Sequence, residues 1–313
     1  MSLLIECGGV KDIENIAGNV TLTSCWKNGA SKLEYTILPD LAPSNGSYLT
    51  FSPGADMFAG RVFAHRRTQD KRIQVTAYDQ LRYLKAKDTV MRKQMSLTQF
   101  VEVIAANLQL RVAGLANSVI PLDDYLFDNQ TYLDMAYQSI SDNLMANGYY
   151  YCLYDRFGAL ALTDLLDMRL PLIVGEKSLG FKYEYEVSID SDTYNQVKLA
   201  YDNKKTGKRD IYIARDSNNI GRWGVLQHFE KVTSGTDAQL IDKANMLLKL
   251  KNRETVTLTM SALGDVRVRG GSGVRVILND CGIDLWAIVD KAVHKWSNGI
   301  HTMDLTLVID GSL

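Results

Sequence analysis

The sequence predicts an α+β fold that is mainly β, with two small antiparallel β-barrels and α/β insertions between and around them. The first observation is a series of four runs with alternating and β-branched residues near the C-terminus, at 254–260, 273–278, 285–293 and 301–308. The second is a similar series at 32–37, 46–51, 57–65 and 72–77. In both series a glycine opens the second run and a histidine, His65 or His294, closes the third, which predicts a duplicated barrel.

Residues 1–80 are predicted to form the first barrel. Two further strands are expected at 2–5 and 19–23, and glycine-containing pairs such as Asn28–Gly29 and Pro53–Gly54 mark the turns between strands. Closing such short strands into a barrel removes the exposed edges that would otherwise pair with other chains.

Residues 81–178 are predicted to form an α+β insertion domain, which the segment Tyr78–Leu84 enters with helical character. Ser96 and Gln99 have the spacing of a capping box, and the apolar stripe of a helix follows them at Phe100, Val101, Ile104 and Leu108. A second helix is expected from 131 to 146, with Asn147–Gly148 as its left-handed end. A hairpin is expected from the runs 149–154 and 159–163.

Residues 179–313 are predicted to form the second barrel together with an inserted helix near 236–251. Strands are expected at 181–187, 195–201, 209–214 and 224–229, and the polar run 202–207 forms the end of a hairpin. Thr236 and Gln239 have the capping-box spacing that begins the inserted helix.

Composition places the chain among ordinary globular proteins, with 46% hydrophobic and 23% charged residues. The 35 basic and 36 acidic residues nearly cancel, which argues against specific nucleic-acid binding. No apolar run approaches the length of a membrane span, and the N-terminus lacks the pattern of a signal peptide. The chain is therefore expected to be made in the bacterial cytoplasm, with its scattered cysteines, Cys7, Cys25, Cys152 and Cys281, as reduced thiols.

Two loop-like motifs suggest ligands but fit them poorly. The run Asp216–Gly221 begins like a calcium loop, yet Ile220 and Gln227 stand where oxygen ligands are required, so a turn held by Asp and Asn side chains is favoured. The run Gly270–Gly273 lacks the Lys and Ser/Thr of a phosphate-binding loop and is expected to be a tight loop between strands. Arg267 and Arg269 alternate with valines, as in a half-exposed strand.

The remaining titratable residues give no catalytic pattern. His294 and His301 flank a predicted turn, 295–300, and are expected to face each other as structural histidines, because no third metal ligand accompanies them. Paired carboxylates at Asp123–Asp124 and at Asp190 and Asp192 lie in polar surroundings and neither support nor exclude a glycosidase. No nucleophile motif is present. No catalytic, cofactor-binding or metal-binding residue is therefore predicted, and no cofactor.

With these residues in place, the chain resembles the baseplate hub proteins of contractile phage tails, in particular the XkdQ/YqbQ group of PBSX-type prophages. That group is related to late control gene D proteins and to the hub part of type VI secretion spikes. The resemblance rests on order and spacing between residues 74 and 305, in the runs Gln74–Leu84, Asn147–Tyr151, Tyr154–Leu160, Tyr194–Leu199, Lys205–Arg209, Asp216–Ile220, Trp223–Gln227 and His301–Leu305.

The resemblance implies that both barrels are tail-tube-like and that the protein is a homotrimer in the baseplate of a virion tail or a phage-tail-like particle. Three chains with two barrels each would match a sixfold tube on one side and a threefold spike on the other. The implied partners are the tail tube or distal tube protein, the central spike protein and other baseplate proteins. The residues of these interfaces are not predicted.

Two other functions remain open at this point. A tail-associated cell-wall hydrolase would need a helical lobe with buried acidic residues, whereas the middle segment predicts about two full helices. A barrel that binds oligonucleotides or sugars would need a basic or aromatic groove, which the balanced charge disfavours.

Overall fold

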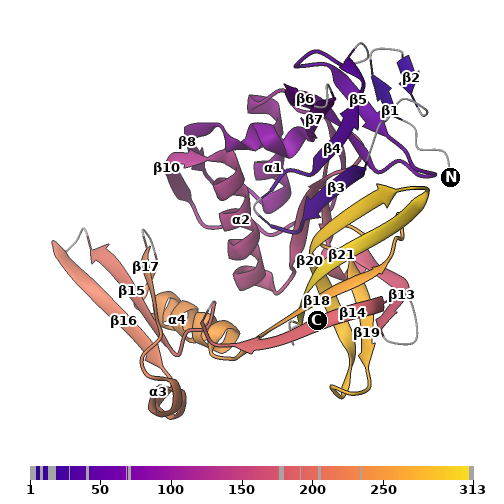
Figure 1. Cartoon of the computed structure of the whole chain (residues 1–313). Coiled ribbons are helices and arrows are strands. Elements are labelled where there is room, and N and C mark those ends of the chain that lie inside the picture. Colours follow the sequence, from indigo (N-terminus) through magenta and orange to yellow (C-terminus); the bar gives the residue numbers. More distant parts are fainter. Residues whose placement is uncertain are drawn as a thin grey trace. The chain divides into compact units, whose positions relative to one another are not determined.

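About half of the described residues lie in β-strands (Figure 1). The computed structural model describes residues 5–7, 10–12, 19–27, 29–39, 42–67, 69, 72–175, 180–190, 192–203, 206–232 and 235–309. The chain divides into two compact units, which are described separately. Unit 1 comprises Met1–Leu122, Leu126–Glu184 and Leu258–Leu313, and unit 2 comprises Asp123–Tyr125 and Tyr185–Thr257.

The longest strand, β20 (Ile283–Ser297), joins the two ends of the sequence in one sheet. Its first part pairs antiparallel with β19 (Gly273–Leu278), and its second part pairs antiparallel with β3 (Val20–Cys25). Along its other edge it pairs with β21 (Ile300–Ile309). Among the described residues, the N-terminal and C-terminal β regions of unit 1 are therefore parts of a single 13-stranded sheet.

The N-terminal part of this sheet follows the predicted strands closely. Its strands after β3 are β4 (Lys32–Ile37), β5 (Tyr48–Phe51), β6 (Phe58–Arg67) and β7 (Ile73–Tyr78), and β1 (Ile5–Cys7) and β2 (Val10–Asp12) extend it. Buried and half-buried residues alternate strictly along β3 and β4. The buried side chains form one core, in which Trp296 of β20 packs edge-on against Phe51. Most of the strand predicted at 2–5 lies outside the described residues.

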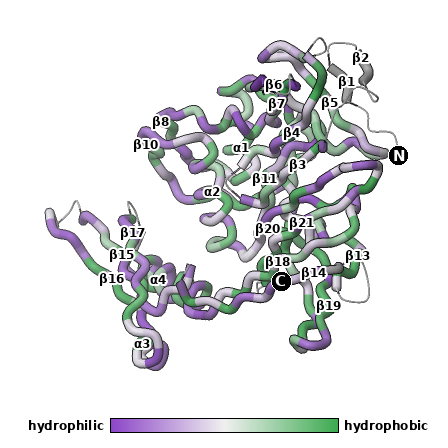
Figure 2. The backbone as a smooth tube through the Cα atoms, viewed as in Figure 1, coloured by the Kyte–Doolittle hydropathy of each residue, from purple (hydrophilic) through white to green (hydrophobic). Residues whose placement is uncertain are grey.

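The C-terminal part of the sheet has its own core. Its strands besides β19, β20 and β21 are β13 (Arg169–Gly175), β14 (Gly180–Ser188) and β18 (Thr255–Leu263). Apolar side chains of these strands form a second buried cluster, which includes Val174, Met260 and Val276. Figure 2 shows hydrophobic and hydrophilic residues interspersed along the strands of both parts. The prediction of a long turn at 295–300 is wrong, because β20 and β21 continue to a two-residue turn at Asn298 and Gly299, with φ of 51° and 76°.

The insertion contains two helices and two small sheets. Its elements are the 3-10 helix η2 (Gln80–Lys85), β8 (Lys87–Arg92), α1 (Leu97–Asn107), β9 (Val112–Leu115), β10 (Tyr125–Thr131), α2 (Tyr132–Asn147), β11 (Tyr151–Asp155), β12 (Leu160–Asp164) and the 3-10 helix η3 (Leu165–Met168). The capping box at Ser96 and the left-handed end of α2 at Gly148 are confirmed. Strands β8, β9, β10 and β13 are absent from the sequence prediction.

Unit 2 contains a three-stranded sheet and two helices. The strands are β15 (Gln196–Asn203), β16 (Lys208–Arg215) and β17 (Gln227–Val232), and the helices are α3 (Ser217–Trp223) and α4 (Asp237–Lys251). The capping box at Thr236 is confirmed. One face of the sheet packs its Val197, Leu199 and Ala214 against Leu240 and Ala244 of α4.

These elements confirm the predicted fold class, which is mainly β with barrels and α/β insertions, and the strand pairs of unit 1 are mostly antiparallel, whereas β13 and β19 pair parallel. The predicted division into segments 1–80, 81–178 and 179–313 stays a prediction. Among the described residues no helix has the length and apolar character of a membrane span.

Candidate functional site

The loop between β18 and β19, residues 264–272, connects three parts of unit 1, and we call it the junction loop. The Gly270 amide donates to Ser24 Oγ on β3 over 3.0 Å. A Cβ atom at Gly270 would lie 2.2 Å from the carbonyl carbon of Cys25, so the two backbones meet here without room for a side chain. The predicted strand character of Arg267 and Arg269 is wrong, because this run leaves the sheet to make these contacts.

Arg269 connects the junction loop to the hairpin formed by β11 and β12. Its Nη1 donates to the carbonyl oxygen of Asp155 over 2.9 Å, and its guanidinium lies 4.0 Å from the centre of the Tyr154 ring. A planar cation above an aromatic ring is favourable, and more so away from water. The adjacent Gly271 has a φ of 90°, a backbone conformation that residues with a side chain rarely adopt. The predicted tight loop at 270–273 is confirmed.

Two buried carboxyl groups lie beside this contact. Asp79 is 2% exposed, and its two oxygens accept from the backbone amides of Ser31 (2.8 Å) and Leu81 (3.0 Å). Asp155 is 6% exposed and accepts from the Gly158 amide (2.7 Å) and from Gln80 Nε2 (3.2 Å). Burial, followed by the nearby Asp155 carboxylate, raises the pKa of Asp79 to about 7. Burial also raises the pKa of Asp155.

The two predicted structural histidines do face each other across β20 and β21. His294 Nδ1 lies 2.9 Å from His301 Nε2, and His294 Nε2 lies 2.9 Å from the carbonyl oxygen of Val268 in the junction loop. Because a carbonyl only accepts, His294 carries its proton on Nε2 and accepts from His301 at Nδ1. Burial lowers the pKa of His294 to about 4, and burial also lowers the pKa of His301. Both rings stack with Trp296.

A β-bulge at Asp290 marks the point where β20 changes partners. The register with β21 shifts between Val289 and Lys291. The Val289 amide donates to Ser272 of the junction loop over 2.8 Å, and the Trp26 amide donates to Asp290 over 2.7 Å. The bulge, the junction loop and the two buried carboxyl groups of Asp79 and Asp155, which we call the acid pair, therefore bring the two ends of the sheet and the insertion together in one place.

The other sequence candidates lie apart from this junction. Asp216 caps α3 through its contacts with the amides of Asn218 (2.8 Å) and Asn219 (3.1 Å), so the turn predicted at 216–221 is wrong and the run forms a helix. Asp192 forms an ion pair with Lys251 at 2.5 Å. Asp123 and Asp124 are exposed. Across the described ranges, no three His, Cys, Asp or Glu side chains come together as a metal site would require.

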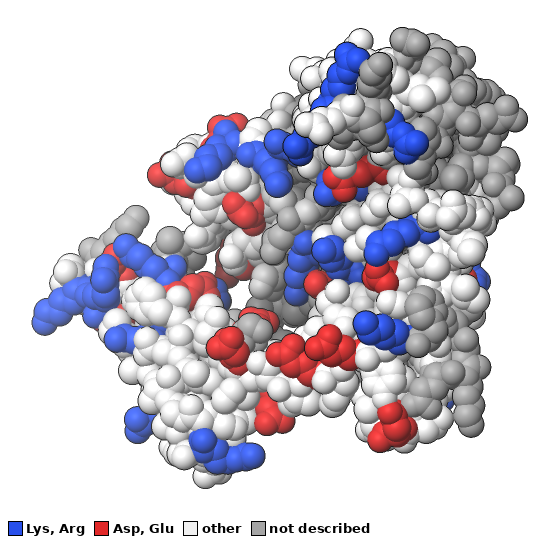
Figure 3. Space-filling model, in the orientation of Figure 1, with Lys and Arg blue, Asp and Glu red and all other residues white. Residues whose placement is uncertain are grey.

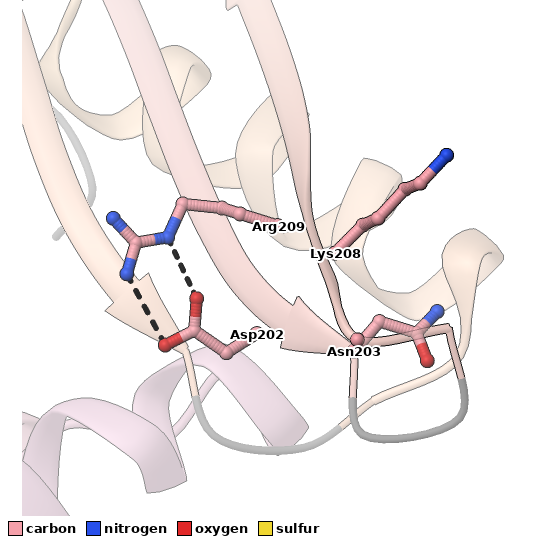
Figure 4. A pocket seen from close by; sticks show the side chains of 5 residues that line it. Asp202, Asn203, Lys208 and Arg209 are labelled. Atoms are coloured by element: carbon pink, nitrogen blue, oxygen red, sulfur yellow. Dashed lines mark hydrogen bonds and ion pairs between the residues drawn. The ribbon is translucent and has the colours of Figure 1, made fainter.

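A shallow hollow lies at the hairpin end of β15 and β16 (Figure 4). Asp202 there accepts from Arg209 Nε over 2.6 Å and lies 2.7 Å from Lys231 Nζ, and these contacts lower the pKa of Asp202. Lys208 points away from the ion pair in Figure 4. Two of the charged residues that line the hollow, Asp202 and Arg209, are therefore already paired with each other.

The acid pair and the junction loop contacts could not be found from the sequence. Asp79 and Asp155 are 76 positions apart, and Gly270 and Ser24 are 246 apart. Asp79 directly precedes a helical run, and Asp155 opens a predicted hairpin. These local sequence patterns indicate a helix cap and a turn, and they do not indicate that the two carboxyl groups lie close together. The contacts of the junction hold the two ends of the sheet and the insertion in a fixed arrangement.

Two relatives from Bacillus subtilis (strain 168) align with most of the chain. The phage-like element PBSX protein XkdQ is 29% identical over 323 residues, covering 97% of each protein. The uncharacterized protein YqbQ is 27% identical over 275 residues, covering 86% of this chain and 83% of the relative.

Solved structures share the fold at low sequence identity. The 43 kDa tail protein of prophage MuSo2 from Shewanella oneidensis has a TM-score of 0.74 at 12% identity, covering 100% of this chain and 99% of the other. A tail protein from Neisseria meningitidis MC58 has a TM-score of 0.73 at 16% identity, covering 99% and 97%. The c3393 protein of E. coli, a type VI secretion component described as similar to the T4 tail proteins gp27 and gp5, has a TM-score of 0.58 at 10% identity, covering 98% and 77%.

The family model described as YQBQ-like matches residues 20–308, which include both parts of the sheet, the insertion, the junction loop and unit 2. The chain therefore belongs to the YQBQ-like family.

Proposed function

We propose that the chain is a structural protein of a phage tail or phage-tail-like particle, and that it acts there as the baseplate hub. Its relative XkdQ belongs to the phage-like element PBSX, and its fold is shared with two prophage or bacterial tail proteins. The observation that carries the proposal is the single sheet of unit 1, in which β20 unites two barrels in one scaffold.

In this proposal the chain forms a homotrimer that joins the sixfold tail tube to the threefold central spike. Three copies with two barrels each present six similar β surfaces, and closed symmetry of this kind needs duplication and no catalytic group. The similarity to a type VI component that itself resembles gp27 and gp5 supports a position next to a spike. The tube or distal tube protein, the spike and other baseplate proteins are the proposed partners, and the virion tail baseplate is the proposed location.

A tail-associated cell-wall hydrolase is the second candidate, and the acid pair is the feature that bears on it. Asp79 and Asp155 are 2% and 6% exposed, and backbone amides contact both carboxyl groups. A glycan strand must reach both carboxyl groups of a glycosidase. The burial of this pair therefore supports a structural role, without an enzymatic activity or a cofactor.

The experiment is to co-express the chain with its spike protein and to measure the mass and symmetry of the complex by native mass spectrometry and electron microscopy. Three copies of the chain per three spike chains are expected, with pseudo-sixfold density on the face opposite the spike. A complex with one, two or four copies would refute the hub arrangement. A peptidoglycan zymogram that clears with the wild type, and fails to clear after Asp155→Asn, would instead support the hydrolase.

A further inference from the structure

The sheet of unit 2 has one face covered by α4 and a second face with an apolar centre. Strand registers place Ile213, Lys198 and Phe229 side by side in one row across this second face, and Ile211, Ala200 and Lys231 in the next. We call the surface formed by these two rows the open face. Figure 2 shows β16 changing from hydrophilic residues at its hairpin end to hydrophobic ones towards α3.

The apolar side chains of the open face are large and half exposed. Ile213 is 55% exposed, Phe229 54% and Ile211 43%, whereas Ala200 between them is fully buried. Because Ala200 has a small side chain, its longer neighbours in the register cover it and form a continuous surface. A group of adjacent exposed apolar side chains, as distinct from isolated ones, is typical of an interaction site.

Charged residues around this centre are mostly cationic. Arg209 and Arg215 flank the isoleucines along β16, and Lys198 and Lys231 lie in the two rows. Among the described residues of this face there is one carboxylate, Asp202, and it contacts both Arg209 and Lys231. Figure 3 shows Lys and Arg side chains gathered over the hairpin end of β15 and β16. The open face is therefore apolar in the centre with a net positive rim.

Three kinds of partner fit this surface poorly. A second copy that docks by the same face would bring two net positive rims together, which electrostatics disfavours. A lipid surface takes up a continuous apolar face with its cationic residues on the opposite side, whereas Lys198 and Lys231 lie in the same rows as the apolar side chains of the open face. A single-stranded nucleic acid is bound through successive stacking rings, and the two rows contain one ring, Phe229.

We propose that the open face of unit 2 docks an acidic amphipathic polypeptide segment of another protein, with apolar side chains on Ile211, Ile213 and Phe229 and carboxylates against the cationic rim. Aromatic residues and arginine are enriched in protein interfaces, and the open face carries Phe229 on β17 and Arg209 and Arg215 on β16. The inference rests on the registers, exposures and charges of unit 2, and it holds whether or not the chain is a hub.

The test measures binding of the purified full chain to two synthetic helical peptides. Both carry leucines along one side, and one has glutamates flanking them whereas the other has lysines. Vesicles of phosphatidylglycerol and a single-stranded oligothymidylate serve as the competing anionic probes. Fluorescence anisotropy reports peptide and oligonucleotide binding, co-sedimentation reports vesicle binding, and analytical ultracentrifugation reports the mass of the chain.

The glutamate peptide is expected to bind, and Phe229→Ser and Lys198→Glu are each expected to weaken it by about tenfold. The matched controls on α4 are Ile241→Ser, at a side chain that is 50% exposed, and Lys249→Glu, and they should leave the affinity unchanged. Equal binding of the lysine peptide, or equal loss in the controls, would overturn the proposal. The proposal would also be overturned if vesicles or the oligonucleotide bound more tightly than the glutamate peptide in a way that depends on Phe229, or if the chain formed a dimer that Phe229→Ser abolishes.

Discussion

Replacing Asp79 by asparagine should change how the stability of unit 1 depends on pH. In the wild type, two backbone amides, those of Ser31 and Leu81, donate to the two carboxyl oxygens. An asparagine side chain has a single oxygen, so one of these buried amides loses its acceptor. A buried donor without a partner costs about 1–3 kcal/mol, and this cost is the same at every pH.

The pH-dependent part follows from the pKa of Asp79, which burial and then Asp155 raise to about 7. In the unfolded chain the same carboxyl group titrates near pH 3.9. A raised carboxyl pKa gives stability that is complete below about pH 3.9 and is lost as the pH rises through about 7. With these two pKa values, the wild type should lose about 2–3 kcal/mol of unfolding free energy between pH 5 and pH 8 through this group.

The two histidines act in the opposite direction, so the wild type alone does not isolate the effect. Burial lowers the pKa of His294 to about 4 and lowers the pKa of His301. Their contribution to stability is present above about pH 6.5 and is lost as the pH falls through their lowered pKa values. Because Asp79→Asn leaves both histidines in place, the difference between the two proteins removes their contribution.

The assay is urea denaturation of both proteins at pH 5 and pH 8 at constant ionic strength. The variant should be the less stable protein at pH 5, and the difference should shift in its favour by about 2–3 kcal/mol at pH 8. Asp56→Asn, at an exposed carboxylate, is the control and should show no such shift. A difference that is constant with pH, or that grows against the variant at pH 8, would refute the assignment of a raised pKa to Asp79.

Three further substitutions test an ion pair and two glycine positions in unit 1, and Gly221→Ala in unit 2 serves as a control. Arg92→Met removes a guanidinium that is 1% exposed and paired with a carboxylate, and should cost about 3–5 kcal/mol in urea denaturation. Gly270→Ala places a Cβ 2.2 Å from the carbonyl carbon of Cys25 and should cost about 1–3 kcal/mol, whereas Gly221→Ala, with open space around it, should be neutral or stabilising. Gly299→Ala, at a φ of 76°, should cost about 1–2 kcal/mol and lower the thermal midpoint. Losses for Gly221→Ala as large as those for Gly270→Ala would contradict the close approach at the junction loop.

Sequence patterns predict the elements that have one buried and one exposed side. Strands β3 and β4 alternate in burial and are predicted almost to the residue, as are the helices that start at Ser96 and Thr236. Strand β8 is exposed along most of its length, so it lacks the alternation by which a strand is recognised. Strand β13 contains Pro171, and a proline within a run argues against predicting a strand there.

The contacts of the junction could not be predicted from the sequence for a different reason. Its contacts join residues such as Ser24 and Gly270, and Asp155 and Arg269, whose proximity depends on how the sheet is assembled. The run from Val266 to Arg269 alternates like a strand, but pairing with a neighbour would remove the Gly270 contact with β3 and the Arg269 contact with the hairpin. Tertiary contacts therefore override the local pattern at this point.

The length of β20 has a mechanical consequence. A sideways or twisting load on one barrel passes to the other along a continuous peptide backbone, with covalent bonds in series and ladder hydrogen bonds on both edges. Two barrels joined by a flexible linker would absorb such a load by reorienting, and two barrels joined by side chains would slip at their contact. Because β20 is common to both barrels, strain at one end of unit 1 passes to the other through this strand, and the bulge at Asp290 is the point where its ladder with β21 is interrupted.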